Sequence, residues 1–130
     1  MSPRPAGRHT PCTLADARAR FHDAEAFLDT AHLATDPYVI ATLAIHAAIA
    51  AADAICCVAL REHSTDGNHA AAVELLGRVD TTLAGALSRS LNRKTQAAYE
   101  SPDIAAKDAA VCVCQATILT ATARARILET

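Results

Sequence analysis

Aromatic side chains are scarce in this sequence, which has two phenylalanines, two tyrosines and no tryptophan among its 130 residues. Four rings are too few for the aromatic platforms on which proteins stack single-stranded nucleic acid. An excess of charge of one sign is also missing: the formal net charge is −2, so the molecule as a whole does not attract nucleic acid. Only four glycines occur, and they form no glycine-rich phosphate loop. Composition therefore argues against three common ways of binding nucleic acids and nucleotides.

The five cysteines lack the spacing of a disulfide framework or of a metal site. Their number is odd, Cys56 and Cys57 are adjacent, and Cys112 and Cys114 form a C-x-C pair. A metal site would need ligands gathered from different helices, because residues two apart on a helix point in nearly opposite directions. We therefore expect reduced thiols buried as small apolar side chains, with no metal and no cofactor. No secretory leader precedes Cys12, so a cytoplasmic location is expected.

Alanine is abundant instead, supplying 32 of the 130 residues, and it is the best helix former and a poor strand former. The length suits one domain that buries its own core. Residues 1–12 contain three prolines, a glycine and two arginines, and we expect them to form a flexible N-terminal arm. Residues 13–130 are expected to form a single all-α domain.

Apolar periodicity and capping residues predict four long helices and one short helix after the arm. Thr13 and Asp16 resemble a capping box, and Asp36 with Pro37 suits an N-cap followed by a first helical residue. No segment has the pattern of a strand. Because the connections between the long helices are short, we expect an up-and-down bundle of antiparallel neighbours. The expected ranges are about 13–34, 36–62, 69–79, 80–99 and 104–127.

The second of these segments raises the question of a membrane span, because residues 38–60 are mostly apolar. Its aliphatic residues favour insertion by about 4 kcal/mol in total, whereas Asp53 opposes insertion by about 3 kcal/mol and His46 adds to that cost. Alanine contributes almost nothing. Since the sum is near zero, we expect a buried central helix and no membrane association.

A polar seam runs along this expected central helix and consists of Thr42, His46, Asp53 and Cys57. At 100° per residue, the four side chains fall within about 60° of one another. A carboxylate on an apolar helix has to be paired, hydrogen-bonded or protonated, because an unpaired buried charge costs several kcal/mol. We therefore expect a cation from another helix beside Asp53. The alternatives are a functional polar pocket and, more commonly, a seam that faces solvent or makes structural hydrogen bonds.

A basic segment, residues 89–99, ends the fourth expected helix. Arg89 and Arg93 share a face at i and i+4, Lys94 is adjacent, and Gln96 continues the face towards Tyr99. Such a face is able to hold nucleic-acid phosphates bidentately. The more common alternative is a solvated basic face near a helix C-terminus, which the helix dipole favours.

Four segments together resemble the HEPN superfamily (higher eukaryotes and prokaryotes nucleotide-binding), a group of helical bundles. The resemblance spans roughly residues 38–127, and the order and spacing of the segments carry it. The segments are residues 44–55 (AIHAAIAAADAI), 69–76 (HAAAVELL), 91–99 (LNRKTQAAY) and 108–116 (DAAVCVCQA).

The resemblance implies a set of site residues. Nucleases of this family use an Arg-x(4–6)-His motif, often followed by Tyr, which faces its copy across a two-fold dimer. Arg93 and Tyr99 occupy the arginine and tyrosine positions, but Ala98 stands where the histidine is expected. No imidazole is then present to act as general acid or base on an RNA 2′-hydroxyl. The family's acidic residue on the central helix matches Asp53, which predicts a pairing of Asp53 with Arg93.

The sequence is compatible with three functions. The leading one is a non-catalytic or degenerate HEPN-like homodimer of toxin–antitoxin or defence type, with a nucleotidyltransferase-like protein, an antitoxin or RNA as partner. The alternative is a metal-independent endoribonuclease with a composite dimer cleft made of Arg93, Tyr99, Asp53 and His46. The third is a small-ligand binder in the bundle core.

Overall fold

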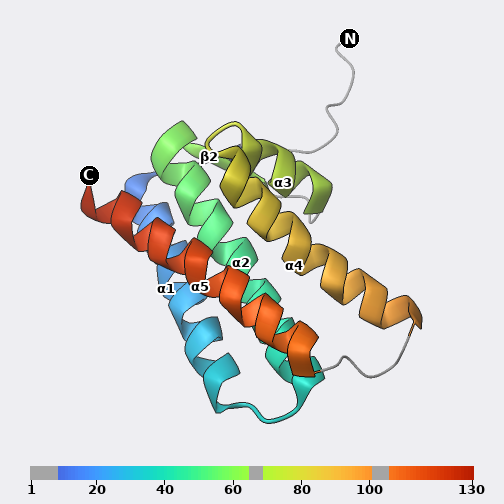
Figure 1. Ribbon diagram of the computed structural model, residues 1–130. Coiled ribbons are helices and arrows are strands. Elements are labelled where there is room, and N and C mark those ends of the chain that lie inside the picture. The colour runs from blue at the N-terminus through green and yellow to red at the C-terminus, as the bar shows by residue number, and fades with distance from the viewer. Residues whose placement is uncertain (1–8, 65–68, 101–105) are drawn as a thin grey trace.

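The computed structural model describes residues 9–64, 69–100 and 106–130, with side chains of the fourth helix described as far as Arg93. The protein is mostly helical, as the sequence predicts, and carries one small two-stranded sheet (Figure 1). The helices are α1 (Leu14–Leu33), α2 (Pro37–Leu60), α3 (His69–Gly77), α4 (Thr81–Glu100) and α5 (Ala106–Leu128). The strands are β1 (His9–Pro11) and β2 (Glu62–Ser64).

Local capping fixes the start of α1 as predicted and also that of α4, whereas Asp36, the predicted N-cap of α2, makes no side-chain cap hydrogen bond. The backbone N–H of Thr13 donates to Asp16 Oδ2 at 2.8 Å, and the backbone N–H of Asp16 donates to Thr13 Oγ1 at 3.2 Å, which completes the capping box of α1. At the start of α4, Asp80 Oδ1 accepts from the backbone N–H groups of Thr82 and Leu83. Both caps satisfy N–H groups that have no partner inside their helix.

Helix α2 is the central element, and its burial confirms the prediction of a core helix. It runs between α1 and α5, with α4 and α3 on a third side (Figure 1). Thirteen of its 24 residues are buried, most of them alanine. Alanine lets neighbouring helices approach α2 closely, and the larger core side chains come from several helices. These larger residues include Ile45, Ile55, Leu75, Leu76, Leu87 and Leu119.

The two-stranded sheet contradicts the expectation that no strand forms. Strands β1 and β2 are antiparallel, with Thr10 opposite His63 at the centre of the pairing. Arg61 ends α2 in the left-handed conformation (φ 58°), and this turn sends β2 back along the helix. Neither three-residue strand alternates apolar and polar positions, so the sequence pattern does not reveal them.

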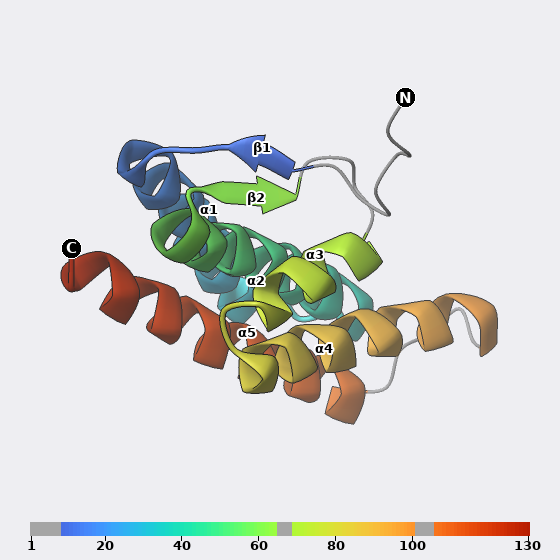
Figure 2. The same ribbon diagram turned by 90° about the horizontal axis from the view of Figure 1, so that it is seen from above.

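The same pairing corrects the expected flexible arm. Residues 9–12 of that arm are held against β2 and the end of α2, with the backbone N–H of Cys12 donating to Arg61 O at 2.9 Å. Figure 2 shows the sheet on the side of α2 that faces away from α5. Residues 1–8 lie outside the described residues.

Candidate functional site

Asp53 has the cationic partner that its burial requires. The carboxyl group lies on α2 with 8% of the residue exposed. Arg20 of α1 donates to Asp53 Oδ2 from Nε at 3.2 Å and from Nη2 at 2.8 Å. The Arg20 Nη1 atom also contacts Asp23 Oδ2 at 3.2 Å. The predicted cation from another helix is therefore confirmed, and it comes from α1.

Two opposing effects act on the Asp53 carboxyl group. Burial raises its pKa because it disfavours the charged form, while the hydrogen bonds and positive charge of Arg20 lower it. His63 lowers it further, which places that ring within electrostatic reach of the carboxyl group. Burial is the largest effect, and the pKa of Asp53 stays above its ordinary value.

The predicted pairing of Asp53 with Arg93 is wrong within the chain. Arg93 Nη1 of α4 donates to Asp108 Oδ1 of α5. Arg93 and Arg20 therefore pair with different carboxylates. His46 lies elsewhere, with its ring stacked on Phe27 at a centroid distance of 5.4 Å. Of the residues proposed for a composite cleft, Asp53, His46 and Arg93 therefore have different neighbours within the chain: Arg20, Phe27 and Asp108.

The basic segment is only partly described. Arg89 is exposed, and the Arg93 side chain is 41% exposed while it pairs with Asp108. Lys94, Gln96, Ala98 and Tyr99 belong to α4, but their side chains lie outside the described residues. The ion pair offsets the charge of Arg93, which weakens the basic character of this surface.

A disulfide joins Cys12 and Cys57 and corrects the expectation of reduced thiols at these positions. The two residues are 45 positions apart in the sequence, with their Cα atoms 5.7 Å apart, and both are buried. The β1–β2 pairing carries Cys12 to the last turn of α2, so no spacing between cysteines could have revealed the partner. The odd number of cysteines, which argued against a disulfide framework, is accounted for by one disulfide and three free thiols.

The other three cysteines divide between the core and the surface. Cys56 and Cys112 are buried and free, as expected. Burial raises the pKa of Cys56 to about 12 and raises that of Cys112, so neither thiol is prepared for thiolate chemistry. Cys114 is exposed, which contradicts the expectation that it is buried.

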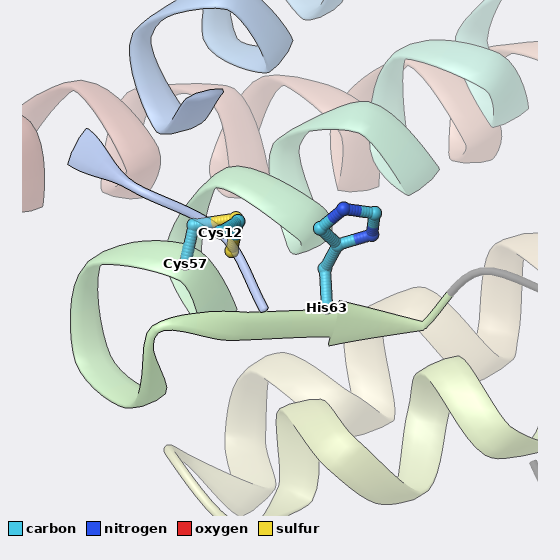
Figure 3. Close-up of side chains that lie close together, drawn as sticks. All are labelled: Cys12, Cys57 and His63. Atoms are coloured by element: carbon cyan, nitrogen blue, oxygen red, sulfur yellow. A yellow bond between two sulfur atoms is a disulfide. The ribbon is translucent and has the colours of Figure 1, made fainter. Parts of the chain in front are cut away.

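His63 lies beside the disulfide and completes a group that we call the Cys–His cluster: Cys12, Cys57 and His63 (Figure 3). The two sulfur atoms and a ring nitrogen of His63 all lie within 4.8 Å of one another. His63 Nδ1 lies 2.9 Å from Ser64 O, which makes Nδ1 the protonated nitrogen that donates. The three residues come from the segment after β1, from the last turn of α2 and from β2, so spacing in the sequence does not reveal that they lie together.

The polar seam changes its surroundings along α2. Cys57 and Asp53 form its buried end, against β1, β2 and α1. Thr42 is half-buried and donates from Oγ1 to Tyr38 O, and His46 is exposed. Only the buried end is thus a candidate site, whereas the other end is the common case of structural hydrogen bonds and solvent contact.

Helix α5 presents an exposed, uncharged surface, which we call the outer face of α5: Ala110, Cys114, Ile118, Ala121 and Ala125. At 100° per residue, these five positions lie within about 80° on one side of the helix. By length and composition alone, α2 and α5 are both apolar enough to cross a membrane. The chain itself buries most of α2 but little of α5, and Ile118 remains 45% exposed.

No family model matches the chain, and comparison with curated proteins and solved structures finds no similar protein. A function for this chain therefore has to follow from its own side chains and surfaces.

Proposed function

We propose that the chain is a HEPN-like up-and-down helical bundle that acts in the cytoplasm as a non-catalytic interaction module and assembles as a homodimer. The observation that carries this proposal is the outer face of α5. Contiguous apolar patches on a protein surface mark sites of protein–protein interaction. Burial of this face against a partner removes apolar surface from water, at roughly 25 cal/mol per Å².

A second copy of the chain is the partner that the outer face of α5 suits best. No charged residue lies between Asp108 and Arg124 along α5, so no oppositely charged partner is required there. Three alanines and one cysteine let an identical helix approach closely. A two-fold axis through Ile118 would place the same face on both sides of the interface, as a closed dimer requires.

Three residues support a non-catalytic role. Ala98 stands where the family's nucleases have histidine, Arg93 is held by Asp108, and His46 is stacked on Phe27 of another helix. General acid–base catalysis needs an imidazole within hydrogen-bond reach of the reacting proton. None of these described contacts brings His46 to Arg93.

The further partner that we propose for the dimer is a protein of a toxin–antitoxin or defence pair, such as a nucleotidyltransferase-like protein or an antitoxin. Binding of RNA phosphates is less favoured, because Asp108 offsets the charge of Arg93 and leaves Arg89 as the exposed cation on the described part of this surface.

Light scattering on the full chain tests the homodimer. We expect a mass near twice the 13.6 kDa of one chain, falling towards the monomer on dilution. Ile118→Glu places a charge in the outer face of α5 and is expected to give a monomer. Val39→Glu is the matched control, because Val39 is also β-branched and is 43% exposed against 45% for Ile118.

Val39 lies in the first turn of α2, where a carboxylate is favoured by the helix dipole. The control is therefore expected to remain a folded dimer. A wild-type chain that stays monomeric at every concentration contradicts the proposal, and so does an Ile118→Glu variant that remains dimeric.

A further inference from the structure

We propose that the Cys–His cluster is a Zn²⁺ site when its disulfide is reduced, with Cys12 Sγ, Cys57 Sγ and His63 Nε2 as ligands. Two thiolates and one imidazole are a common zinc ligand set, and a water molecule fills the fourth position in open sites of this kind. The site is independent of the proposed dimer, because the sheet and α5 lie on opposite sides of α2 (Figure 2).

The backbone already holds the three ligands in place. Cys12 follows β1, and its N–H donates to Arg61 O at 2.9 Å. Cys57 lies in the last turn of α2, and His63 lies at the centre of β2, opposite Thr10. The ligand atoms lie within 4.8 Å of one another (Figure 3). Zinc–ligand bonds of about 2.0–2.3 Å at tetrahedral angles place two thiolate sulfurs about 3.8 Å apart, a separation within the 4.8 Å that the three ligand atoms already span.

A hydrogen bond at Nδ1 of His63 leaves its Nε2 atom available for a metal. Ser64 O can only accept, so the 2.9 Å contact makes Nδ1 the donor, and the neutral form of the ring carries its proton on Nδ1 and its lone pair on Nε2. A backbone carbonyl on the distal nitrogen is the usual support of a metal-binding histidine, since it fixes both the tautomer and the ring orientation.

The electrostatic surroundings also suit a cation. His63 lies within electrostatic reach of two carboxyl groups, those of Asp16 and Asp53. Asp53 is buried, and its charge is only partly offset by Arg20, whose side chain is shared with Asp23. Two thiolates and Zn²⁺ together are neutral, so the occupied site adds no net charge to this buried region.

Reduction of the disulfide and binding of Zn²⁺ convert the first form into the second. Two molecules of a small cellular thiol give two electrons and two protons to the Cys12–Cys57 disulfide, yielding two cysteine thiols and one small-molecule disulfide. Binding of Zn²⁺ then releases the two thiol protons. Both the disulfide and the zinc complex connect Cys12 to Cys57, so β1 stays attached to α2 in either form.

Metal binding by the full wild-type chain tests the proposal without any substitution. The chain is compared oxidised and after anaerobic reduction by a phosphine, with Zn²⁺ uptake measured by competition with a chromophoric chelator. We expect one Zn²⁺ per chain in the reduced form and none in the oxidised form. Co²⁺ in place of Zn²⁺ is expected to give sulfur-to-cobalt charge-transfer bands and tetrahedral d–d bands.

Four variants identify the ligands. Cys57→Ala is expected to abolish the tight site, whereas Cys56→Ala, at the neighbouring buried thiol, is expected to retain it. His63→Ala is expected to weaken Zn²⁺ binding by at least about tenfold, whereas His22→Ala, at an exposed position on α1, has no effect. The His63→Ala chain keeps its disulfide, so its fold is verified by circular dichroism before reduction.

Zinc is also expected to raise the unfolding midpoint of the reduced wild type, and not that of Cys57→Ala. The proposal is overturned by equal Zn²⁺ uptake in the oxidised and reduced chains, by absence of uptake in the reduced chain, or by equal affinity in Cys57→Ala and Cys56→Ala. Unchanged affinity in His63→Ala also overturns it.

Discussion

Arg20 of α1 holds Asp53 of α2 through two nitrogen atoms that donate to the same carboxylate oxygen, at 3.2 Å and 2.8 Å. This pair links the first helix to the central one at the buried end of the polar seam. Asp53 therefore pairs with Arg20 and not with Arg93, which pairs with Asp108. The family resemblance predicts a pair between Asp53 and Arg93, but each of these residues pairs with a different partner. The Arg20–Asp53 pair can be tested by substitution.

Arg20→Ala is expected to lower the free energy of unfolding by about 2–3 kcal/mol. The substitution leaves a buried carboxylate without its cation, which usually costs about 3–5 kcal/mol, and partial exposure of the Arg20 side chain reduces that value. Urea denaturation measures the change. Arg18→Ala, at an exposed position of the same helix, is the control, and equal effects of the two substitutions would contradict the assignment.

The loss caused by Arg20→Ala is expected to shrink as the pH falls from about 7 towards about 4. The folded-state pKa of Asp53 is raised, so the native state binds a proton before the unfolded state does and gains stability on acidification. Without Arg20, the two contributions that lower this pKa are lost, and the gain is larger. Urea denaturation at several pH values measures how the free energy of unfolding changes with pH. The double variant Arg20→Ala/Asp53→Asn has no carboxyl group at position 53 and is expected to lack the additional gain.

Removal of the disulfide by Cys12→Ser is expected to lower the free energy of unfolding by about 2–4 kcal/mol, measured without added metal. The bond closes a loop spanning 45 positions and restricts the unfolded chain accordingly. Thiol titration of the wild type in denaturant tests the disulfide directly. We expect three reactive thiols before reduction and five afterwards. Five thiols in freshly purified, unreduced protein would show that the bond does not form under those conditions.

Cys114 is expected to react first with an alkylating reagent in the native protein, because it is exposed while Cys56 and Cys112 are buried. Its labelling rate is expected to fall as protein concentration rises, since the homodimer covers the outer face of α5. Peptide mass spectrometry follows the rate at each site. In the Ile118→Glu variant the rate should be independent of concentration, and a wild type that behaves in the same way argues against this interface.

The chain is expected not to cleave tRNA or single-stranded RNA. Gel electrophoresis after incubation with purified wild type and with Arg93→Ala is the measurement, and we expect both to leave the RNA intact. Cleavage by the wild type that Arg93→Ala abolishes would favour the composite ribonuclease cleft over the non-catalytic module.

Features that depend on near neighbours in the sequence were predictable. Thr13 with Asp16 and the Asp80 cap mark helix starts because their partners lie two or three residues away. The nearly uniform apolar character of α2 indicates the central helix, because an all-apolar helix has to be covered on every side. The need of Asp53 for a cation follows equally from its sequence surroundings.

Tertiary structure alone decided which residues meet. Arg20 instead of Arg93 reaches Asp53, and Cys12 reaches Cys57, because the rotation and relative position of α1, α2 and the small sheet are set by packing over the whole core. A helix period states which side chains share a face, but it contains no information about the element opposite that face. The sequence alone specifies the capped helix starts, the core helix and the need for a buried ion pair. Long-range packing selects the partner in each pair and brings His63 close to Cys12 and Cys57.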